Sequence, residues 1–374
     1  MSAAPGRVRR IALLTSGGDC SGLNAIIRAV VLRASQLGWE VTGISYGTQG
    51  LLGEHTQTRR LRPEDVDTVM MRQSGTILGT TNKGDPFAYP MPDGSVKDRS
   101  WEIIENFRKT GCDSLIGIGG DGSLPILLRL SEQGGIPLIC VPKTIDNDVP
   151  LTETAVGFDT AVEVATEALD RLQPTAASHN RIMVLEVMGR GAGHIALAAG
   201  IASGVDVILL PEIPYDIDIV ADHLRGVQTP AHRFGIVVVS EAARPKGGSV
   251  RTQVMQDGQV RLGGVGAVVG AQISELCQAE TRVTVLGHVQ RGGQPSAWDR
   301  LTAAAFGVRA VDLLNAGQSG RMVAWSQRGV TDVLIADVIA RGAHPVEPDD
   351  SLVRVARGLG ICLGDQPAHV NAVR

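Results

Sequence analysis

The sequence predicts an α/β protein whose parallel sheets are covered by helices on both faces. Apolar runs rich in β-branched residues, such as "RIALLT" (10–15), "SLIGIGG" (114–120) and "RFGIVVVSE" (233–241), have the length and composition of buried strands. Segments with helical spacing, such as "GLNAIIRAVVLRASQLG" (22–38), alternate with these runs. Repeated strand–helix units of this kind favour parallel sheets.

The same alternation continues along most of the chain. Further strands are expected at 40–47, 137–142, 181–189, 205–212 and 281–288, and further helices at 123–135 and 160–172. Residues 80–100 lack periodicity and are rich in Pro, Gly and Asp, which indicates a long loop of functional importance. Residues 244–262 are expected to form a shorter polar hairpin or loop, and the tail after about 340 contains no recognisable motif.

Composition narrows the function classes. A chain of 374 residues favours two domains. A net charge of −4 and only 12 aromatic residues argue against binding to nucleic acid or to an anionic membrane surface. Five scattered cysteines form no zinc-binding pattern and indicate reduced thiols, and the sequence contains no membrane-spanning stretch. We therefore expect a soluble cytoplasmic protein.

Glycine-rich turns follow two of the expected strands, at the strand ends where ligands bind in parallel α/β folds. In "SGGDCSGLN" (16–24), Gly17 and Gly18 leave backbone N–H groups exposed before a helix. The turn is either a phosphate cradle or a tight strand-to-helix connection. In "GGDGS" (119–123), Asp121 either binds Mg²⁺ or makes a hydrogen bond within the turn.

A third strand exit, "PKTIDNDV" (142–149), places two carboxylates and a lysine directly after an apolar run. Thr144, Asp146 and Asp148 alternate, so an extended segment would present all three on one side. One carboxylate would accept a proton from a substrate hydroxyl while the other orients a metal or a lysine. The alternative is a solvated loop without a catalytic role.

Four arginines lie at strand borders in the second half of the chain: Arg181, Arg190, Arg282 and Arg291. A single arginine at such a place is usually a surface charge. Four of them indicate a site for a phosphorylated substrate, because the guanidinium group binds phosphate in a bidentate manner.

Taken in order, these motifs resemble the 6-phosphofructokinase family and its mixed-substrate bacterial group. The resemblance covers about residues 10–325 and rests on "TSGGDCSGLNAIIRAV", "GGDGS", "PKTIDNDV", "GFDTA", "SHNR", "MGR" and "LGHVQRGGQPSAWDR". It implies a donor-binding domain (1–158 and 290–340), a sugar-phosphate-binding domain (159–289 and 341–374) and an active site in the cleft between them. It also implies a homotetramer with active sites shared between subunits, and a role in glycolysis.

The resemblance assigns a role to each matching residue. It makes Asp146 the base that accepts the proton of the fructose 6-phosphate 1-hydroxyl, with Thr144 beside the transferred group, Asp148 supporting the charge network and Arg190 stabilising the transferring phosphoryl group. The expected donor-binding residues are Gly18, Asn82, Lys83, Gly120, Asp121, Gly122 and Ser123, with Mg²⁺ on Asp121. The expected sugar-phosphate-binding residues are Thr144, Ile145, Asp146, Met188, Gly189, Arg190, Glu241, His288 and Arg291, joined by Arg181 and Arg282 of a neighbouring subunit.

Two positions distinguish the phosphoryl donor. Pyrophosphate-using members of the family usually carry a bulkier acid where this chain has Gly122, and a lysine where it has Lys143. A side chain at position 122 would occupy the space of the nucleotide α-phosphate, so Gly122 favours ATP. Many ATP-using members have an arginine where this chain has Asn82, and Lys83 is the expected substitute. The alternatives are pyrophosphate as donor, a lipid or dinucleotide kinase suggested by "GGDGS" alone, and a catalytically silent sugar-phosphate sensor.

Overall fold

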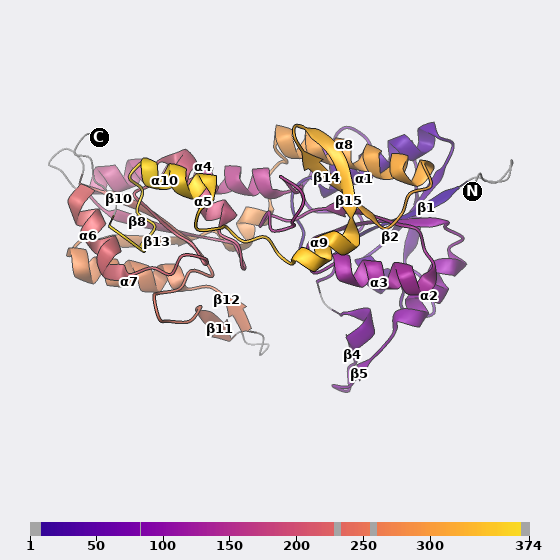
Figure 1. Ribbon diagram of the computed structural model, residues 1–374, viewed down its shortest axis with the longest axis horizontal. Coiled ribbons are helices and arrows are strands. Elements are labelled where there is room, and N and C mark those ends of the chain that lie inside the picture. Colours follow the sequence, from indigo (N-terminus) through magenta and orange to yellow (C-terminus); the bar gives the residue numbers. More distant parts are fainter. Residues whose placement is uncertain (1–8, 83, 228–232, 255–259, 368–374) are drawn as a thin grey trace. The chain divides into compact units, whose positions relative to one another are not determined.

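The computed structural model describes residues 9–82, 84–227, 233–254 and 260–367 (Figure 1). They form two compact units. Unit 1 takes the chain up to Thr160 together with Arg291–His344, and unit 2 takes Ala161–Gln290 together with the chain from Pro345 onward. The predicted assignment of the phosphoryl donor to the first unit and of the sugar phosphate to the second stays a prediction.

Unit 1 is built on a seven-stranded sheet with the order β15-β14-β7-β6-β1-β2-β3. Its strands β1 (Arg10–Thr15), β6 (Ser114–Gly119) and β7 (Leu138–Pro142) pair in parallel and are buried over nearly their whole length. Such continuous burial explains why their sequences are apolar runs rather than alternating patterns. The predicted α/β fold with buried parallel strands is confirmed in this sheet.

Helices cover both faces of this sheet. In Figure 1, α1 (Leu23–Gln36) and α8 (Ala297–Asn315) lie on one face, and α2 (Ser100–Lys109), α3 (Leu124–Gly134) and α9 (Ile335–Arg341) lie on the other. The packed side chains of α2, α3 and α9 form one hydrophobic core with β6 and β7. The sheet therefore holds the carboxyl ends of β1, β6 and β7 in fixed register.

The outer strands of unit 1 add antiparallel pairs to the parallel part of the sheet. The strands β2 (Glu40–Ile44) and β3 (Thr58–Leu61) pair antiparallel, as do β14 (Arg321–Ser326) and β15 (Gly329–Leu334). Gln327 and Arg328, which join β14 to β15, both have positive φ. That is the conformation of a two-residue turn that matches the twist of a hairpin. Neither residue is a glycine, so the sequence carries no turn signal here.

Unit 2 has a four-stranded parallel sheet with the order β13-β8-β10-β9. Its strands are β8 (Ile182–Val187), β9 (Val207–Leu209), β10 (Gly235–Ser240) and β13 (Thr281–Val285). In Figure 1, α5 (His194–Ser203) and α10 (Ser351–Gly358) lie on one face, and α6 (Ile217–Val227) and α7 (Val265–Cys277) on the other. The tail without a motif thus contributes α10 to this unit.

The remaining elements are short connections and one long helix. The helix α4 (Phe158–His179) begins in unit 1 and continues in unit 2, and the 3-10 helix η5 (Gly287–Arg291) ends at the return to unit 1. The expected loop at 80–100 contains η4 (Pro86–Ala88) and a small hairpin of β4 (Tyr89–Pro90) and β5 (Val96–Lys97). The expected hairpin at 244–262 contains β11 (Thr252–Val254) and β12 (Val260–Leu262). Further 3-10 turns are η1 (Gly47–Leu51), η2 (Pro63–Asp65) and η3 (Met70–Arg72).

Candidate active site

Three turns lie side by side at the carboxyl edge of the unit 1 sheet, because β7, β6 and β1 are neighbours in it. Side chains connect the three turns. The Ser123 hydroxyl, after β6, donates to the Ser16 hydroxyl, after β1, at 3.0 Å. The Lys143 ammonium, after β7, donates to the Gly18 carbonyl at 2.5 Å. Segments that are distant in sequence therefore form one connected surface.

The first turn, after β1, requires its glycines. Gly17 has a φ of 84°, and a Cβ atom there would lie 3.0 Å from the Lys143 Nζ atom. A Cβ atom on Gly18 would lie 2.8 Å from the Arg291 Nη1 atom. The Gly17 N–H donates to the Thr81 carbonyl at 2.9 Å, which brings the exposed Asn82 next to the same turn. Lys83, the expected substitute for the arginine that many ATP-using members have at position 82, lies outside the described residues.

Two cationic side chains bind consecutive carbonyls of this turn. Lys143 is only 3% exposed and binds Gly18, while the Arg291 Nη1 atom donates to the Asp19 carbonyl at 2.9 Å. Burial lowers the pKa of Lys143, and the neighbouring Arg291 lowers it further. Sequence reasoning had connected Lys143 with donor selectivity and Arg291 with the sugar phosphate. Neither motif gave a signal that both side chains stabilise the turn after β1.

The second turn, after β6, presents a carboxylate to solvent. Asp121 and Gly122 are exposed, whereas Ser123 is buried and its N–H donates to the Gly120 carbonyl at 2.9 Å. A Cβ atom on Gly122 would have no heavy atom within 4 Å, so the space beside this residue is open. Among the described residues no group of three or more His, Cys, Asp or Glu side chains is placed to hold a metal. A single exposed carboxylate is suited to a Mg²⁺ ion that is bound mainly by the phosphate groups of a substrate.

The third turn, after β7, is not the extended segment that would place Thr144, Asp146 and Asp148 on one side. Bends occur at Ile145 and Asp146, and Asn147 has a φ of 51°. The Asn147 side chain accepts from Ala155 N–H at 2.9 Å, which stabilises this left-handed conformation.

Local hydrogen bonds fix this bent turn. The Thr144 hydroxyl accepts from Asp146 N–H at 3.0 Å, and the Asp148 carbonyl accepts from His344 N–H at 2.7 Å. Ile145 is buried, and Asp146 and Asp148 are half-buried. The geometry of the two carboxylates is therefore set by turn hydrogen bonds and not by strand alternation.

A buried carboxylate supports the start of α4 and was missed by sequence reasoning. Asp299 is 1% exposed and accepts from Gly157 N–H, Thr160 N–H and the Thr160 hydroxyl at 2.8, 2.9 and 2.5 Å. It therefore satisfies the first turn of α4 with its carboxylate while lying in the first turn of α8. Burial raises its pKa to about 6, against the lowering effect of these hydrogen bonds. In sequence it looks like an ordinary first-turn acid.

In unit 2, the strand ends present cations. β8 leads into Met188, Gly189 and the exposed Arg190. The Gly189 carbonyl accepts from the Ser240 hydroxyl at 3.1 Å, and its N–H donates to the Glu241 carboxylate at 3.4 Å. β13 leads into η5, where His288 is exposed. The carboxyl edge of this sheet thus brings Met188–Arg190, Glu241 and His288 into one region, as the parallel order requires.

Arg181 and Arg282 lie at the opposite, amino edge of the same sheet. Both make ion pairs with Glu280, at 2.8 Å for Arg181. Arg181 lies seven residues before Met188, so a strand separates them by about 23 Å at roughly 3.3 Å per residue. One chain therefore does not bring Arg181 and Arg282 to its own Arg190, and the four strand-border arginines are not one cluster within a subunit.

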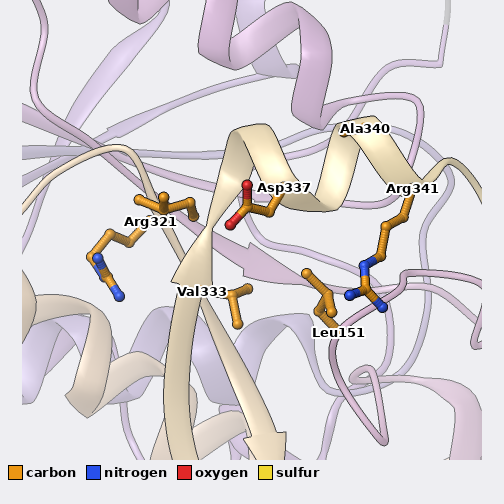
Figure 2. Close-up of a pocket in the computed structure, with 7 residues that line it drawn as sticks. Leu151, Arg321, Val333, Asp337, Ala340 and Arg341 are labelled. Atoms are coloured by element: carbon orange, nitrogen blue, oxygen red, sulfur yellow. The ribbon is translucent and has the colours of Figure 1, made fainter.

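A separate open hollow of about 640 Å³ lies on unit 1 (Figure 2). It is lined by Leu151, Arg321, Val333, Leu334, Asp337, Ala340 and Arg341. The Arg321 guanidinium pairs with Asp332, which also pairs with Arg309. None of the predicted site residues lines this hollow. This hollow is therefore distinct from the predicted site residues.

Comparisons with known proteins agree with the fold and the turns. Glycine turns, carboxylates and cations at the carboxyl ends of parallel strands define an α/β protein equipped for phosphorylated ligands. A sequence model of the phosphofructokinase family matches residues 10–314, and the chain belongs to this family. The predicted family resemblance is thereby confirmed.

Two relatives are similar over nearly their whole length. A Nostoc protein named ATP-dependent 6-phosphofructokinase 1 is 57% identical over 96% of this chain and 99% of its own. The Synechocystis protein of the same name is 55% identical with the same coverage.

Among solved structures, phosphofructokinase from Saccharomyces cerevisiae is similar with a TM-score of 0.77 and 28% identity. The match covers 89% of this chain but only 45% of the yeast chain, so this chain spans less than half the length of that relative. A pyrophosphate-dependent phosphofructokinase from Nitrosospira multiformis has a TM-score of 0.77 at 22% identity, over 98% of this chain and 95% of its own, which shows the fold alone.

Proposed function

We propose that this chain transfers a phosphoryl group from Mg²⁺-bound ATP to the 1-hydroxyl of fructose 6-phosphate, giving fructose 1,6-bisphosphate in glycolysis. The observation that carries the proposal is the connected set of three turns after β1, β6 and β7. They combine half-buried or exposed glycines, an exposed carboxylate and a half-buried carboxylate at one sheet edge. Phosphoryl transfer requires positioning and charge neutralisation more than covalent chemistry, and this edge supplies both.

The turns after β1 and β6 would receive the donor. Gly18, Gly120, Gly122 and Ser123 leave room for phosphates to approach the backbone, and Asn82 lies beside the first turn. Asp121 would hold Mg²⁺, which neutralises charge on the donor phosphates. In this proposal Lys143 and Arg291 hold the turn in shape by binding the Gly18 and Asp19 carbonyls.

The turn after β7 would act on the acceptor. Asp146 would accept the proton of the sugar 1-hydroxyl, and Thr144, which fixes the Asp146 N–H, would lie beside the transferred group. Ile145 and Asp148 would support this turn. From unit 2, Arg190 would stabilise the transferring phosphoryl group, with Met188, Gly189 and Glu241 at the sugar. His288 and Arg291 would bind the 6-phosphate.

The structure supports ATP over pyrophosphate as the donor in two ways. The space beside Gly122 is open, as a nucleotide α-phosphate needs. The Lys143 ammonium is buried and bound to the Gly18 carbonyl, so it has a local role that does not require pyrophosphate. The names of the Nostoc and Synechocystis relatives, at 57% and 55% identity, support ATP as well.

The position of Arg181 and Arg282 supports a shared active site. Because both lie at the amino edge of the unit 2 sheet, they reach a sugar phosphate only if a neighbouring subunit supplies it. We therefore include in the proposal a homotetramer whose subunits exchange these arginines. Dilution that dissociates the tetramer should abolish activity while the far-ultraviolet circular dichroism is unchanged. A monomer isolated by size exclusion with full specific activity would contradict this part.

A cytoplasmic location is part of the proposal. The five cysteines, of which three are buried, are all free thiols, and this suits a reducing compartment. No helix in the described part of the chain is long and apolar enough to cross a bilayer.

One coupled assay tests the reaction. The purified protein is given fructose 6-phosphate with MgATP, Mg-pyrophosphate or neither, and fructose 1,6-bisphosphate is measured through aldolase. We expect product with MgATP, loss of product when Mg²⁺ is chelated, and a much lower kcat/KM with pyrophosphate. Product only with pyrophosphate would reverse the choice of donor. Binding of the sugar phosphate without turnover would indicate the silent sensor, and turnover of lipid or dinucleotide instead would indicate the other kinase class.

A further inference from the structure

Gln290 is the one side chain of η5 that points into unit 2. It is 1% exposed, whereas its neighbours His288 and Val289 are exposed, Val289 to 69%. Its Oε1 atom accepts from Met188 N–H at 2.8 Å, and its Nε2 atom donates to the Ala161 carbonyl in α4 at 3.4 Å. A single buried amide therefore joins η5, the exit of β8 and α4.

These two partners leave the amide only one orientation. A backbone N–H is always a donor and a carbonyl always an acceptor, so Met188 requires the oxygen and Ala161 requires the nitrogen. A methionine of the same length satisfies neither group. A glutamate satisfies both only when it is protonated, because the ionised carboxylate has no hydrogen to donate.

The segment held by Gln290 is the one that presents Arg190. Met188 is bound by Gln290, and Gly189 is bound by the Ser240 hydroxyl and the Glu241 carboxylate. A Cβ atom on Gly189 would lie 2.8 Å from the Ser240 hydroxyl and 2.8 Å from the Ala192 carbonyl, so the segment has little freedom. Arg190 is exposed directly after these fixed residues.

We propose that Gln290 is a positioning residue for the reaction, because it sets where Met188–Arg190 presents the Arg190 guanidinium. The expected effect on kcat rests on the proposed function. The positioning of Met188–Arg190 by Gln290 does not rest on it. Gln290 touches no reacting atom in this role. It acts through the Met188 N–H, and the adjacent His288 shares the same anchor because both residues belong to η5.

The test compares Gln290→Met with Gln294→Met, which removes the same amide from an exposed position four residues away. We expect kcat with MgATP and fructose 6-phosphate to fall by about 10- to 100-fold in Gln290→Met, as misplacement of a catalytic group by a distant substitution does. Binding of ATP should change less than threefold, since both hydrogen bonds of the Gln290 side chain are made to unit 2. Gln294→Met should match wild type.

Hydrogen exchange measured by mass spectrometry separates this inference from the proposed function. Peptides covering residues 186–190 should exchange faster in Gln290→Met and be unchanged in Gln294→Met, whether or not the assay shows turnover. If the wild-type protein is inactive with every donor, that result contradicts the proposed function but not the positioning role of Gln290. Unchanged exchange at 186–190 in Gln290→Met, or an active wild type with kcat unchanged in that variant, would overturn the role of Gln290.

A second variant covers the case in which Gln290→Met does not fold. Gln290→Glu should be most active at low pH, because burial raises the pKa of the introduced carboxyl and its protonated form reproduces both hydrogen bonds. The ratio of its kcat to that of wild type should therefore rise as the pH falls from 8 to 6. A ratio that does not depend on pH would overturn the proposal.

Discussion

The strand ends of the two units use charge in opposite ways. At the carboxyl edge of unit 1, the cation is buried and the acids face outward: Lys143 binds a carbonyl inside, and Asp121 is exposed. At the same edge of unit 2, the polar support is a buried amide and hydroxyl, from Gln290 and Ser240, and the cation Arg190 faces outward. Unit 1 therefore exposes the acid Asp121 where unit 2 exposes the base Arg190.

This difference follows the chemistry that each unit is proposed to perform. A surface that holds Mg²⁺ and accepts a proton needs carboxylates, and a surface that binds a phosphorylated sugar needs cations. In each unit a buried polar group supports the turn that presents the exposed charge.

The largest effect should come from the acid of unit 1 that faces the acceptor. Asp146→Asn keeps the size of the side chain but removes the base, so we expect kcat to fall by about 10²–10⁴-fold with little change in KM for fructose 6-phosphate. The control is Asp337→Asn, an exposed carboxylate on α9 of the same unit. Activity of Asp146→Asn within threefold of wild type would show that the outward acids of unit 1 are not catalytic.

Adding an acid to the same surface should alter the donor. Gly122→Asp has space in the fold, since a Cβ atom there meets nothing within 4 Å. The new carboxylate would repel the ATP α-phosphate, and like charges about 4 Å apart cost about 4 kcal/mol at an intermediate dielectric, or several hundred-fold in binding. Pyrophosphate, which lacks that group, should work better than in wild type.

The measurement for Gly122→Asp is kcat/KM for both donors, with Gly122→Asn as the uncharged control. The asparagine variant should lose ATP activity less than the aspartate variant. Equal losses would mean that size and not charge decides the donor. Intact use of ATP in Gly122→Asp would place Gly122 away from the donor and remove the structural argument for ATP.

The smallest effect concerns Asp299 of unit 1. It differs from the outward-facing acids of this unit because it is buried and lies away from the sheet edge. Its pKa is raised to about 6 by burial. A raised folded-state pKa means that the folded protein keeps the proton longer than the unfolded chain does. Its contribution to stability is therefore full below about pH 4 and is lost as the pH rises through about 6.

Asp299→Asn removes this titration and at least one of the three acceptor contacts. The variant should be less stable than wild type, and its deficit should be largest near pH 4. By pH 7 the deficit should shrink by up to about 3 kcal/mol, from roughly two pKa units. Urea unfolding of both proteins at pH 4, 5.5 and 7 checks the trend. A deficit that grows toward pH 7 would mean that hydrogen bonds, rather than burial, control this carboxylate.

Much of the fold was predictable because local rules determine it. Buried parallel strands require continuous apolar runs, so β1, β6, β7, β8 and β10 were all found from sequence. The antiparallel edge strands were not all found. β14 and β15 alternate only weakly and join through Gln327 and Arg328, which give no turn signal.

The candidate site divides in the same way. The sequence alone predicted which strand ends form the candidate site. Gly17, Asp121 and Asp146 each follow an apolar run, and ligands bind at the carboxyl ends of parallel strands. Only the tertiary structure decided what each side chain does there. In the structure, Lys143 and Arg291 bind carbonyls, and the segment that holds Asp146 is bent. Arg181 and Arg282 pair with Glu280 at the amino edge of their sheet. Gln290 is buried and binds the segment that precedes Arg190. The physical reason is that strand order, which brings residues over a hundred positions apart into contact, is a property of packing and not of any local pattern.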